Sequence, residues 1–181
     1  SFTNNATFNN FGGITLVNNG YTFINTNTGF LKIQTGEFHS ESIFQNAGNI
    51  TITATFKNSG NFTNTGFIQV QHLFENYANF DNEDGSNLNI VSGAHLNNYE
   101  GSNLQNKNGA ALIIFGFLDN YGIFRNTGDV ANDGFLSNHA LMNNDNGGLI
   151  TTTKEFTNNS TFNNNNNATF RVFNNPAFNK G

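Results

Sequence analysis

Apolar residues recur along this chain at intervals of six or eight residues, and most of them are followed two positions later by Asn. The six-residue series are Phe38, Phe44, Ile50, Phe56, Phe62, Ile68, Phe74 and Phe80, and later Leu118, Phe124, Val130, Leu136 and Met142. Between them, at eight-residue spacing, come Leu88, Leu96, Leu104 and Leu112. The series closes with Ile150, Phe156, Phe162, Phe170 and Phe178. Fixed repeats of this kind are typical of solenoids, in which each repeat packs only on its neighbours.

A longer period lies on top of the short one. Roughly every third apolar residue is followed two positions later by a second apolar residue in place of Asn. These pairs are Ile14/Leu16, Leu31/Ile33, Ile50/Ile52, Ile68/Val70, Leu88/Ile90, Leu112/Ile114 and Phe170/Val172, with Val130/Asn132 and Ile150/Thr152 as weaker matches. They lie 17 to 24 residues apart, and mostly 18 to 20. The sequence therefore predicts an all-β parallel β-helix of about nine three-sided coils of 18–20 residues, with two Asn-ended strands and one aliphatic strand in each coil.

Strand geometry places each Phe and its Asn on one side of the chain. Because residues i and i+2 of a strand face the same way, both are expected to point into the coil. Stacked coils would then form Phe columns and hydrogen-bonded Asn ladders, as in cross-β structures. Gly or another small residue often follows the Asn by two positions, where a sharp corner favours it. We expect a single solenoid domain over residues 1–181, uncapped at both ends and about 40–45 Å long at strand spacing.

The composition restricts the possible partners. The chain has 40 Asn and 21 Phe, and only 10% of its residues are charged. A net charge of −5 with seven Lys and Arg argues against nucleic acid, which needs a basic face. No apolar run approaches the length of a membrane span, and there is no Cys for a disulfide framework. The sequence also contains no motif that indicates a cofactor.

The stretches Phe-Lys-Asn-Ser-Gly-Asn-Phe-Thr-Asn-Thr-Gly at 56–66 and Tyr-Gly-Ile-Phe-Arg-Asn-Thr-Gly-Asp-Val-Ala-Asn-Asp-Gly at 121–134 carry a family resemblance. Their repeat pattern resembles the β-helical repeats of filamentous-haemagglutinin-like adhesins and related large surface solenoid proteins. The resemblance covers nearly the whole chain, but this chain uses far more Phe and has no recognisable secretion-domain cap. It implies a right-handed helix, whereas the six-residue repeat alone also suits a left-handed one.

Uncapped coils present unpaired strand edges, which solenoids normally cover. Together with the low charge and the lack of a catalytic motif, these open edges lead us to expect an extracellular or cell-surface structural protein without enzymatic activity. Its partner would be itself, in a head-to-tail filament, or neighbouring solenoid segments of a longer adhesin stalk. The alternative is a module that binds a surface or its glycans, for which the candidate aromatic residues are Tyr21, Tyr77, Tyr99 and Tyr121.

Other functions would need groupings of side chains that the sequence supports only weakly. The densest acidic group, a weak Ca²⁺ candidate and a weak candidate for glycosidic-bond hydrolysis, comprises Glu75, Asp81, Glu83 and Asp84. Glu75 and Asp81 each follow an inward Phe and should point outward on adjacent faces. The histidines occupy different phases of the repeat, so no metal site is predicted from His39, His72, His95 and His139. Thr51, Thr53, Thr55 and Thr151 to Thr153 form local runs and not the single file that an ice-binding face would need.

Six Asn-x-Ser/Thr sequons are candidate glycosylation sites. Their acceptors are Asn5, Asn49, Asn61, Asn158, Asn159 and Asn167. Asn49 and Asn61 precede inward apolar residues, so their side chains should face outward. These two are the better candidates.

Overall fold

The structure is a computed structural model that describes residues 1–16, 20–173 and 178–179. All regular elements within these ranges are β-strands, so none of them is a helix that could cross a membrane. The strands form three parallel sheets, each with nine strands in the described part of the chain. The predicted all-β, three-sided parallel solenoid is therefore confirmed.

Each coil contributes one strand to each sheet. Sheet A comprises β1 (Phe2–Asn4), β4 (Thr22–Asn25), β7 (Ile43–Asn46), β10 (Asn61–Asn64), β13 (Asn79–Asn82), β16 (Asn103–Asn106), β19 (Ile123–Asn126), β22 (Leu141–Asn144) and β25 (Thr161–Asn164). Sheet B comprises β2 (Thr7–Asn10), β5 (Phe30–Ile33), β8 (Asn49–Ile52), β11 (Phe67–Val70), β14 (Asn87–Ile90), β17 (Ala111–Ile114), β20 (Asp129–Asn132), β23 (Leu149–Thr152) and β26 (Thr169–Val172). Sheet C comprises β3 (Ile14–Leu16), β6 (Glu37–Ser40), β9 (Thr55–Asn58), β12 (Leu73–Asn76), β15 (His95–Asn98), β18 (Phe117–Asn120), β21 (Phe135–Asn138), β24 (Glu155–Asn158) and β27 (Phe178–Asn179).

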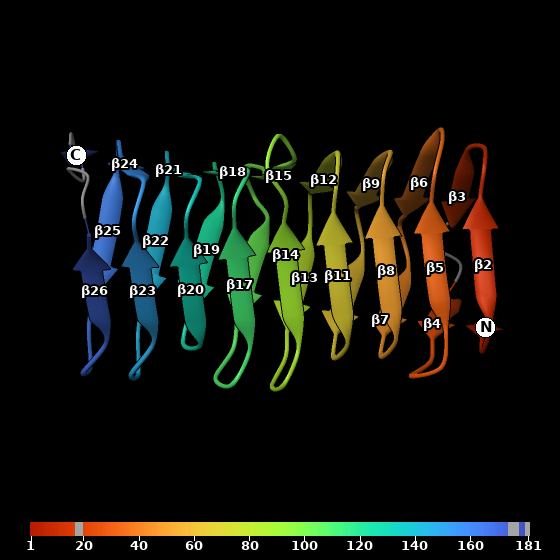
Figure 1. Ribbon diagram of the computed structural model, residues 1–181. Coiled ribbons are helices and arrows are strands. Elements are labelled where there is room, and N and C mark those ends of the chain that lie inside the picture. Colours follow the sequence, from red (N-terminus) through yellow and green to blue (C-terminus); the bar gives the residue numbers. More distant parts are fainter. Residues whose placement is uncertain (17–19, 174–177, 180–181) are drawn as a thin grey trace.

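The coils advance steadily along one axis. In Figure 1 the chain rises along sheet B in front, crosses the top into sheet C behind, and moves from the N-terminus at the right to the C-terminus at the left. That path is right-handed, as expected for crossovers between parallel strands. Each strand pairs in parallel with the strand three places before it and the strand three places after it, so every sheet order steps by three.

The corners explain why the apolar spacing alternates between six and eight. A strand of four residues plus a two-residue corner gives six, and a strand plus a four-residue β-turn gives eight. In these turns the fourth amide donates to the first carbonyl, as Ser86 does to Glu83 at 3.0 Å. The third position has a positive φ, between 73° and 80° at Gly85, Gly93 and Gly101, which a glycine adopts without strain. The widened coils between Leu88 and Leu112 are thus regular coils with larger corners.

The core is a continuous apolar column along the axis. In the N-terminal half, aromatic rings from sheets A and C make stacked, tilted and edge-on contacts. Phe23 stacks on Phe44 with ring centroids 4.7 Å apart, while Phe44 meets Phe56 at 90°. From Leu88 onward most of the core is aliphatic. Burial of each large side chain is worth about 1.5–3 kcal/mol, so this column is a main source of stability.

Two details of the predicted repeat were wrong. Ile14 and Leu16 form β3 in sheet C, opposite Phe38 and Ser40, and do not begin the aliphatic column of sheet B. The first strand of sheet B is β2, which pairs with β5 and comes one strand before the Ile14/Leu16 pair in the chain. At the other end, Phe178 is in register with Thr157, one residue away from the inward series.

Candidate functional site

A ladder of nine asparagines runs along the interior side of sheet A. Each side-chain Nδ2 donates to the Oδ1 of the Asn on the next coil, at 2.7–2.9 Å. The members are Asn4, Asn25, Asn46, Asn64, Asn82, Asn106, Asn126, Asn144 and Asn164. All eight bonds point the same way, with the donor on the N-terminal side, so the ladder has a direction along the axis.

Sheet C carries a second ladder of the same polarity. It runs through Asn58, Asn76, Asn98, Asn120, Asn138 and Asn158, with Nδ2 to Oδ1 distances of 2.7–2.8 Å. The second Nδ2 hydrogen also finds a partner, because Asn98 donates to the Ile123 carbonyl at 3.0 Å and Asn120 to the Leu141 carbonyl at 3.0 Å. The predicted Asn ladders are therefore confirmed, and sheet B holds the aliphatic column from Ile33 to Ile114.

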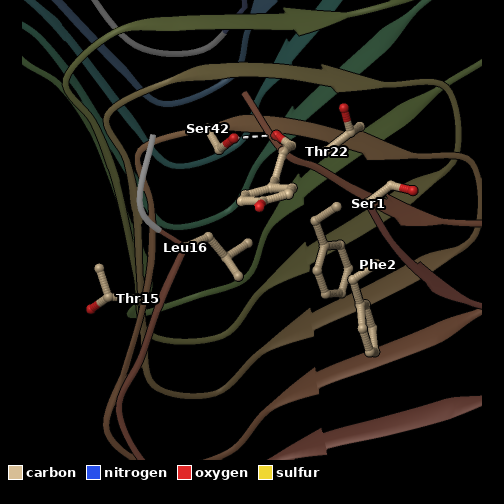
Figure 2. A pocket seen from close by; sticks show the side chains of 8 residues that line it. Ser1, Phe2, Thr15, Leu16, Thr22 and Ser42 are labelled. Carbon is tan, nitrogen blue, oxygen red and sulfur yellow. Dashed lines mark hydrogen bonds between the residues drawn. The ribbon is translucent and has the colours of Figure 1, made fainter. Parts of the chain in front are cut away.

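The N-terminal end of the described solenoid presents β1, β2 and β3, one edge strand from each sheet. Here the core is open. Phe2 is 46% exposed and stacks on Phe23 with centroids 5.0 Å apart. A hollow of about 360 Å³ lies beside it, with Leu16 and Ser42 on its wall (Figure 2). The Ser42 hydroxyl donates to the carbonyl of Tyr21, which also lines the hollow.

The opposite end presents β25, β26 and β27, again one strand from each sheet. Phe162 and Phe170 are only partly buried there and pack on Phe156 with centroids 5.2 and 4.9 Å away. Asn164 ends the sheet A ladder, and its Nδ2 donates to the Ala168 carbonyl at 3.0 Å. The two ends are complementary, because one begins a ladder with an acceptor and the other ends it with a donor.

Three of the four candidate tyrosines form an external column at the corner between sheets C and A. Tyr77 and Tyr99 stack with centroids 4.3 Å apart, Tyr99 and Tyr121 lie 6.5 Å apart, and Tyr121 stacks on His139 at 4.5 Å. Tyr21 lies apart from them, at the N-terminal hollow. A second external stack runs through His95, Phe117 and Phe135 on sheet C. Where the centroids lie 4.3–4.8 Å apart, neighbouring rings cover one another's faces, which favours a role in column stability over sugar stacking.

Glu75 is the most buried acidic residue near this column. It faces outward from β12 as predicted but is only 8% exposed. Its Oε1 accepts hydrogen bonds from the hydroxyls of Tyr99 at 2.9 Å and Tyr77 at 3.2 Å, and Lys57 lies 3.9 Å from Oε2. Burial, the Tyr99 hydrogen bond and the Glu75 charge together raise the pKa of Tyr77 well above its ordinary value. Burial and the charge of Asp119 raise the pKa of Tyr121.

The acidic group does not converge on one point. Asp81 and Glu83 both bind Lys107, at 3.0 and 2.6 Å, whereas Glu75 lies on another sheet. Burial lowers the pKa of Lys107, but its hydrogen bonds to Glu83 and Asp81 outweigh that effect and leave the pKa raised. Asp84 lies in the neighbouring turn against Gly109. The described ranges contain no group of three acidic, His or Cys side chains arranged to hold a metal ion.

The histidines are also separate. His39 lies 4.0 and 3.9 Å from Glu37 and Glu41 and hydrogen-bonds Ser59, and His72 lies at an exposed corner. His95 and His139 belong to the two external stacks. The threonine runs divide between faces, since Thr51 lies on sheet B and Thr55 on sheet C. Thr152 points inward and accepts a hydrogen bond from Asn132.

The sequon asparagines differ in accessibility. Asn5, Asn49, Asn61, Asn159 and Asn167 are exposed. Asn158 is only 2% exposed because it accepts from Asn138 in the sheet C ladder, so its amide is inaccessible in the folded chain. Asn61 accepts from Asn79 at 2.9 Å. Asn49 lies on sheet B in a shallow hollow lined by Phe30, Thr51 and Phe67.

Comparison with protein-family models, with curated proteins and with solved structures gives no match to this chain.

The external tyrosine column was not predicted from the sequence as a stack. A signal for it was nonetheless present. Tyr77, Tyr99, Tyr121 and His139 each directly follow an Asn of the sheet C ladder. Aligning the coils on that Asn would have placed all four rings in one column.

Proposed function

We propose that this chain is a structural module of an extracellular or cell-surface fibre or stalk, and that it works without catalysis. It would extend by axial stacking of its β1–β3 end on the β25–β27 end of another solenoid unit. That unit is a second copy of the chain in a filament, or a neighbouring segment in an adhesin-like stalk. The resemblance of the repeats to filamentous-haemagglutinin-like proteins favours the same role.

The observation that carries this proposal is the directional Asn ladder. A unit stacked head to tail would set Asn164 of one copy before Asn4 of the next and continue the donor-to-acceptor order. A head-to-head joint would instead set acceptor against acceptor. Both ends also present their edge strands in the same order of sheets, so all three sheets can continue together. Open edges of this kind are the usual templates for pairing with another chain.

The apolar ends fit the same arrangement. Continuing sheets A and B would bring Phe162 opposite Phe2, and Phe170 opposite Phe8 of the next unit. The partly exposed rings at both ends would then be buried, as Phe23 and Phe44 are within the solenoid. Burial at these positions supplies the association energy, while the ladder and strand register fix the orientation.

Electron microscopy of the purified chain over a range of concentrations tests this function. We expect unbranched rods that lengthen with concentration. Phe2→Lys places a charge in the axial joint and should stop rod growth. Ile43→Lys is the matched control, because Ile43 has a similar exposure of 42% but faces sideways from sheet A. Isolated short particles of the unmodified chain at every concentration would contradict self-stacking.

A further inference from the structure

Sheet B carries an external slot that differs from both aromatic stacks. Phe30, Asn49 and Phe67 are in register on three consecutive strands, β5, β8 and β11. Asn49 therefore lies between two rings, on the rung where a third ring would stand. The hollow above it has a volume of about 230 Å³, and Thr51 forms part of its floor.

The spacing of the slot fits one ring. Adjacent strands lie about 4.8 Å apart, so Phe30 and Phe67 are separated by two such steps. Elsewhere in this molecule, rings on adjacent rungs stack at this distance, with Phe117 and Phe135 centroids 4.8 Å apart and nearly parallel. A flat ring that extends from Asn49 would contact Phe30 on one side and Phe67 on the other. Lys32 lies 4.8 Å from the Phe30 centroid, a cation–π contact that helps hold this wall.

The sequence at the slot allows a sugar ring to be attached there. Asn49-Ile50-Thr51 is an N-glycosylation sequon, and both its polar side chains lie at the slot. The Asn49 amide is exposed, and its side chain makes no hydrogen bond within the described residues. Asn61, the other well-exposed strand sequon, differs in both respects. It accepts from Asn79, and its register neighbours Ile43 and Asn79 are not aromatic.

We propose that Asn49 is N-glycosylated and that the first sugar, an N-acetylhexosamine, lies between the rings of Phe30 and Phe67. The N-glycosidic bond forms between Asn49 Nδ2 and C1 of the sugar, Nδ2 loses one proton, and the bond from C1 to the diphosphate leaving group of an activated glycosyl donor breaks. The C–H faces of the pyranose then pack on the two aromatic faces, as apolar groups do on ring faces elsewhere. This inference does not depend on axial stacking of the chain.

Secretion of the chain from cultured eukaryotic cells tests the proposal. Peptide mass spectrometry after enzymatic deglycosylation, which converts a modified Asn to Asp, should find Asn49 occupied. Thr51→Ala should abolish that occupancy and Thr51→Ser should retain it. Removal of the sugars should lower the melting temperature by about 2–4 °C, the shift expected for one aromatic contact pair in a domain of this size.

The rings provide the control for the slot. In the Phe30→Ala and Phe67→Ala double variant, sugar removal should no longer change the melting temperature. The Thr51→Ala variant tests a glycan at Asn61. Removal of that glycan should give no change in melting temperature that depends on Phe30 and Phe67. An equal shift in the double variant would overturn the proposal. The proposal would also be overturned if Asn49 is unmodified in the secreted chain and the slot binds free N,N′-diacetylchitobiose in a nuclear magnetic resonance titration. The sugar in the slot would then come from a free glycan.

Discussion

Asparagine suits a buried column because its amide carries donors at one atom and an acceptor at the other. One residue type can therefore repeat on every coil without donor meeting donor. Two positions where this pattern of Asn on Asn is not kept show that other arrangements leave polar groups unpaired. Ser40 lies in the ladder position of sheet C, and its buried hydroxyl has no hydrogen-bond partner among the described residues. The same holds for the Nδ2 of Asn10 in the aliphatic sheet. Both lie in the first coils, where Ser40 is in register with Asn58 at the start of the sheet C ladder and Asn10 is in register with Ile33.

We expect Asn106→Ala to destabilise the fold by about 2–4 kcal/mol, because buried groups that lose a partner cost about 1–3 kcal/mol each. Asn106 accepts from Asn82 at 2.9 Å and donates to Asn126 at 2.8 Å and to the Asp129 carbonyl at 3.0 Å. Urea unfolding measures the change. Asn108→Ala, at an exposed turn position, is the control and should leave the midpoint unchanged. Equal midpoints for the two variants would contradict a stabilising ladder.

The tyrosine column predicts a loss of stability at alkaline pH. The folded pKa of Tyr77 is raised by burial, by its hydrogen bond with Tyr99 and by the charge of Glu75. The folded state therefore keeps a proton on Tyr77 that the unfolded chain releases near pH 10. The contribution of Tyr77 to the free energy of unfolding is fully present below pH 10 and falls as the pH rises above it. Ultraviolet titration of tyrosinate should show this ionisation delayed in the folded chain and absent in Tyr77→Phe. Glu75→Gln should lower the pKa of Tyr77 without returning it to that of free tyrosine. Identical titrations of Glu75→Gln and the unmodified chain would show that the carboxylate has no part in the shift.

At the scale of the elements, two kinds of glycine build the corners. Gly93 is in a four-residue turn at φ 80°, and an added methyl group would have no atom of the described part of the chain within 4 Å. Gly66 is in a two-residue corner, where a Cβ would lie only 2.2 Å from the Gly48 carbonyl oxygen. That oxygen accepts from the Phe67 amide at 2.9 Å. Gly93 is required because the backbone at that position has a positive φ. Gly66 is required because two adjacent coils approach each other closely there.

Substitution by alanine should separate these two roles. Gly93→Ala should cost about 1–2 kcal/mol, the strain of a left-handed alanine. Gly66→Ala should cost more, because its methyl group must push adjacent corners apart and break a backbone hydrogen bond between neighbouring coils. Guanidinium unfolding gives both values. Gly93→Asn should recover part of the loss, since Asn tolerates this conformation. A larger loss for Gly93→Ala than for Gly66→Ala would reverse the assignment.

The repeat made most of this architecture predictable, since a Phe and an Asn two residues apart can both face inward only on a strand. The first coil was less predictable. Ile14 and Leu16 match the aliphatic pattern locally, and only the pairing of Ile14 with Phe38 decides their sheet. The burial of Glu75 could not be predicted, because it depends on Tyr99 from the next coil covering its carboxylate. The placement of Phe30 and Phe67 on either side of Asn49 was equally hard to predict, because this outward position carries a different type of residue from one coil to the next.

At the scale of the whole molecule, each strand touches only the coils on either side. Such a solenoid is nearly one-dimensional, and its stability is close to a sum of coil and interface contributions. The unit that can be removed without harm is therefore the complete coil and not the six-residue repeat. Deleting residues 47–64 takes out β8, β9 and β10, one strand from each sheet. Asn82 would then stack on Asn46, and Ile68 on Leu31, so every column continues.

Deleting residues 47–58 instead removes β8 and β9 and shifts all later strands by one sheet. The strands after the cut still match one another, and the mismatch is confined to one interface. There Asn64 would face Ile33 of the aliphatic column, and Val70 would face Ser40. We expect this shorter deletion to be less stable than the longer one by about 2–4 kcal/mol, because polar groups are left buried without partners. Circular dichroism during urea unfolding should show one transition for the 18-residue deletion and two for the 12-residue deletion, one for each side of the mismatched joint. Greater stability of the shorter deletion would mean that the single strand, and not the three-strand coil, is the cooperative unit.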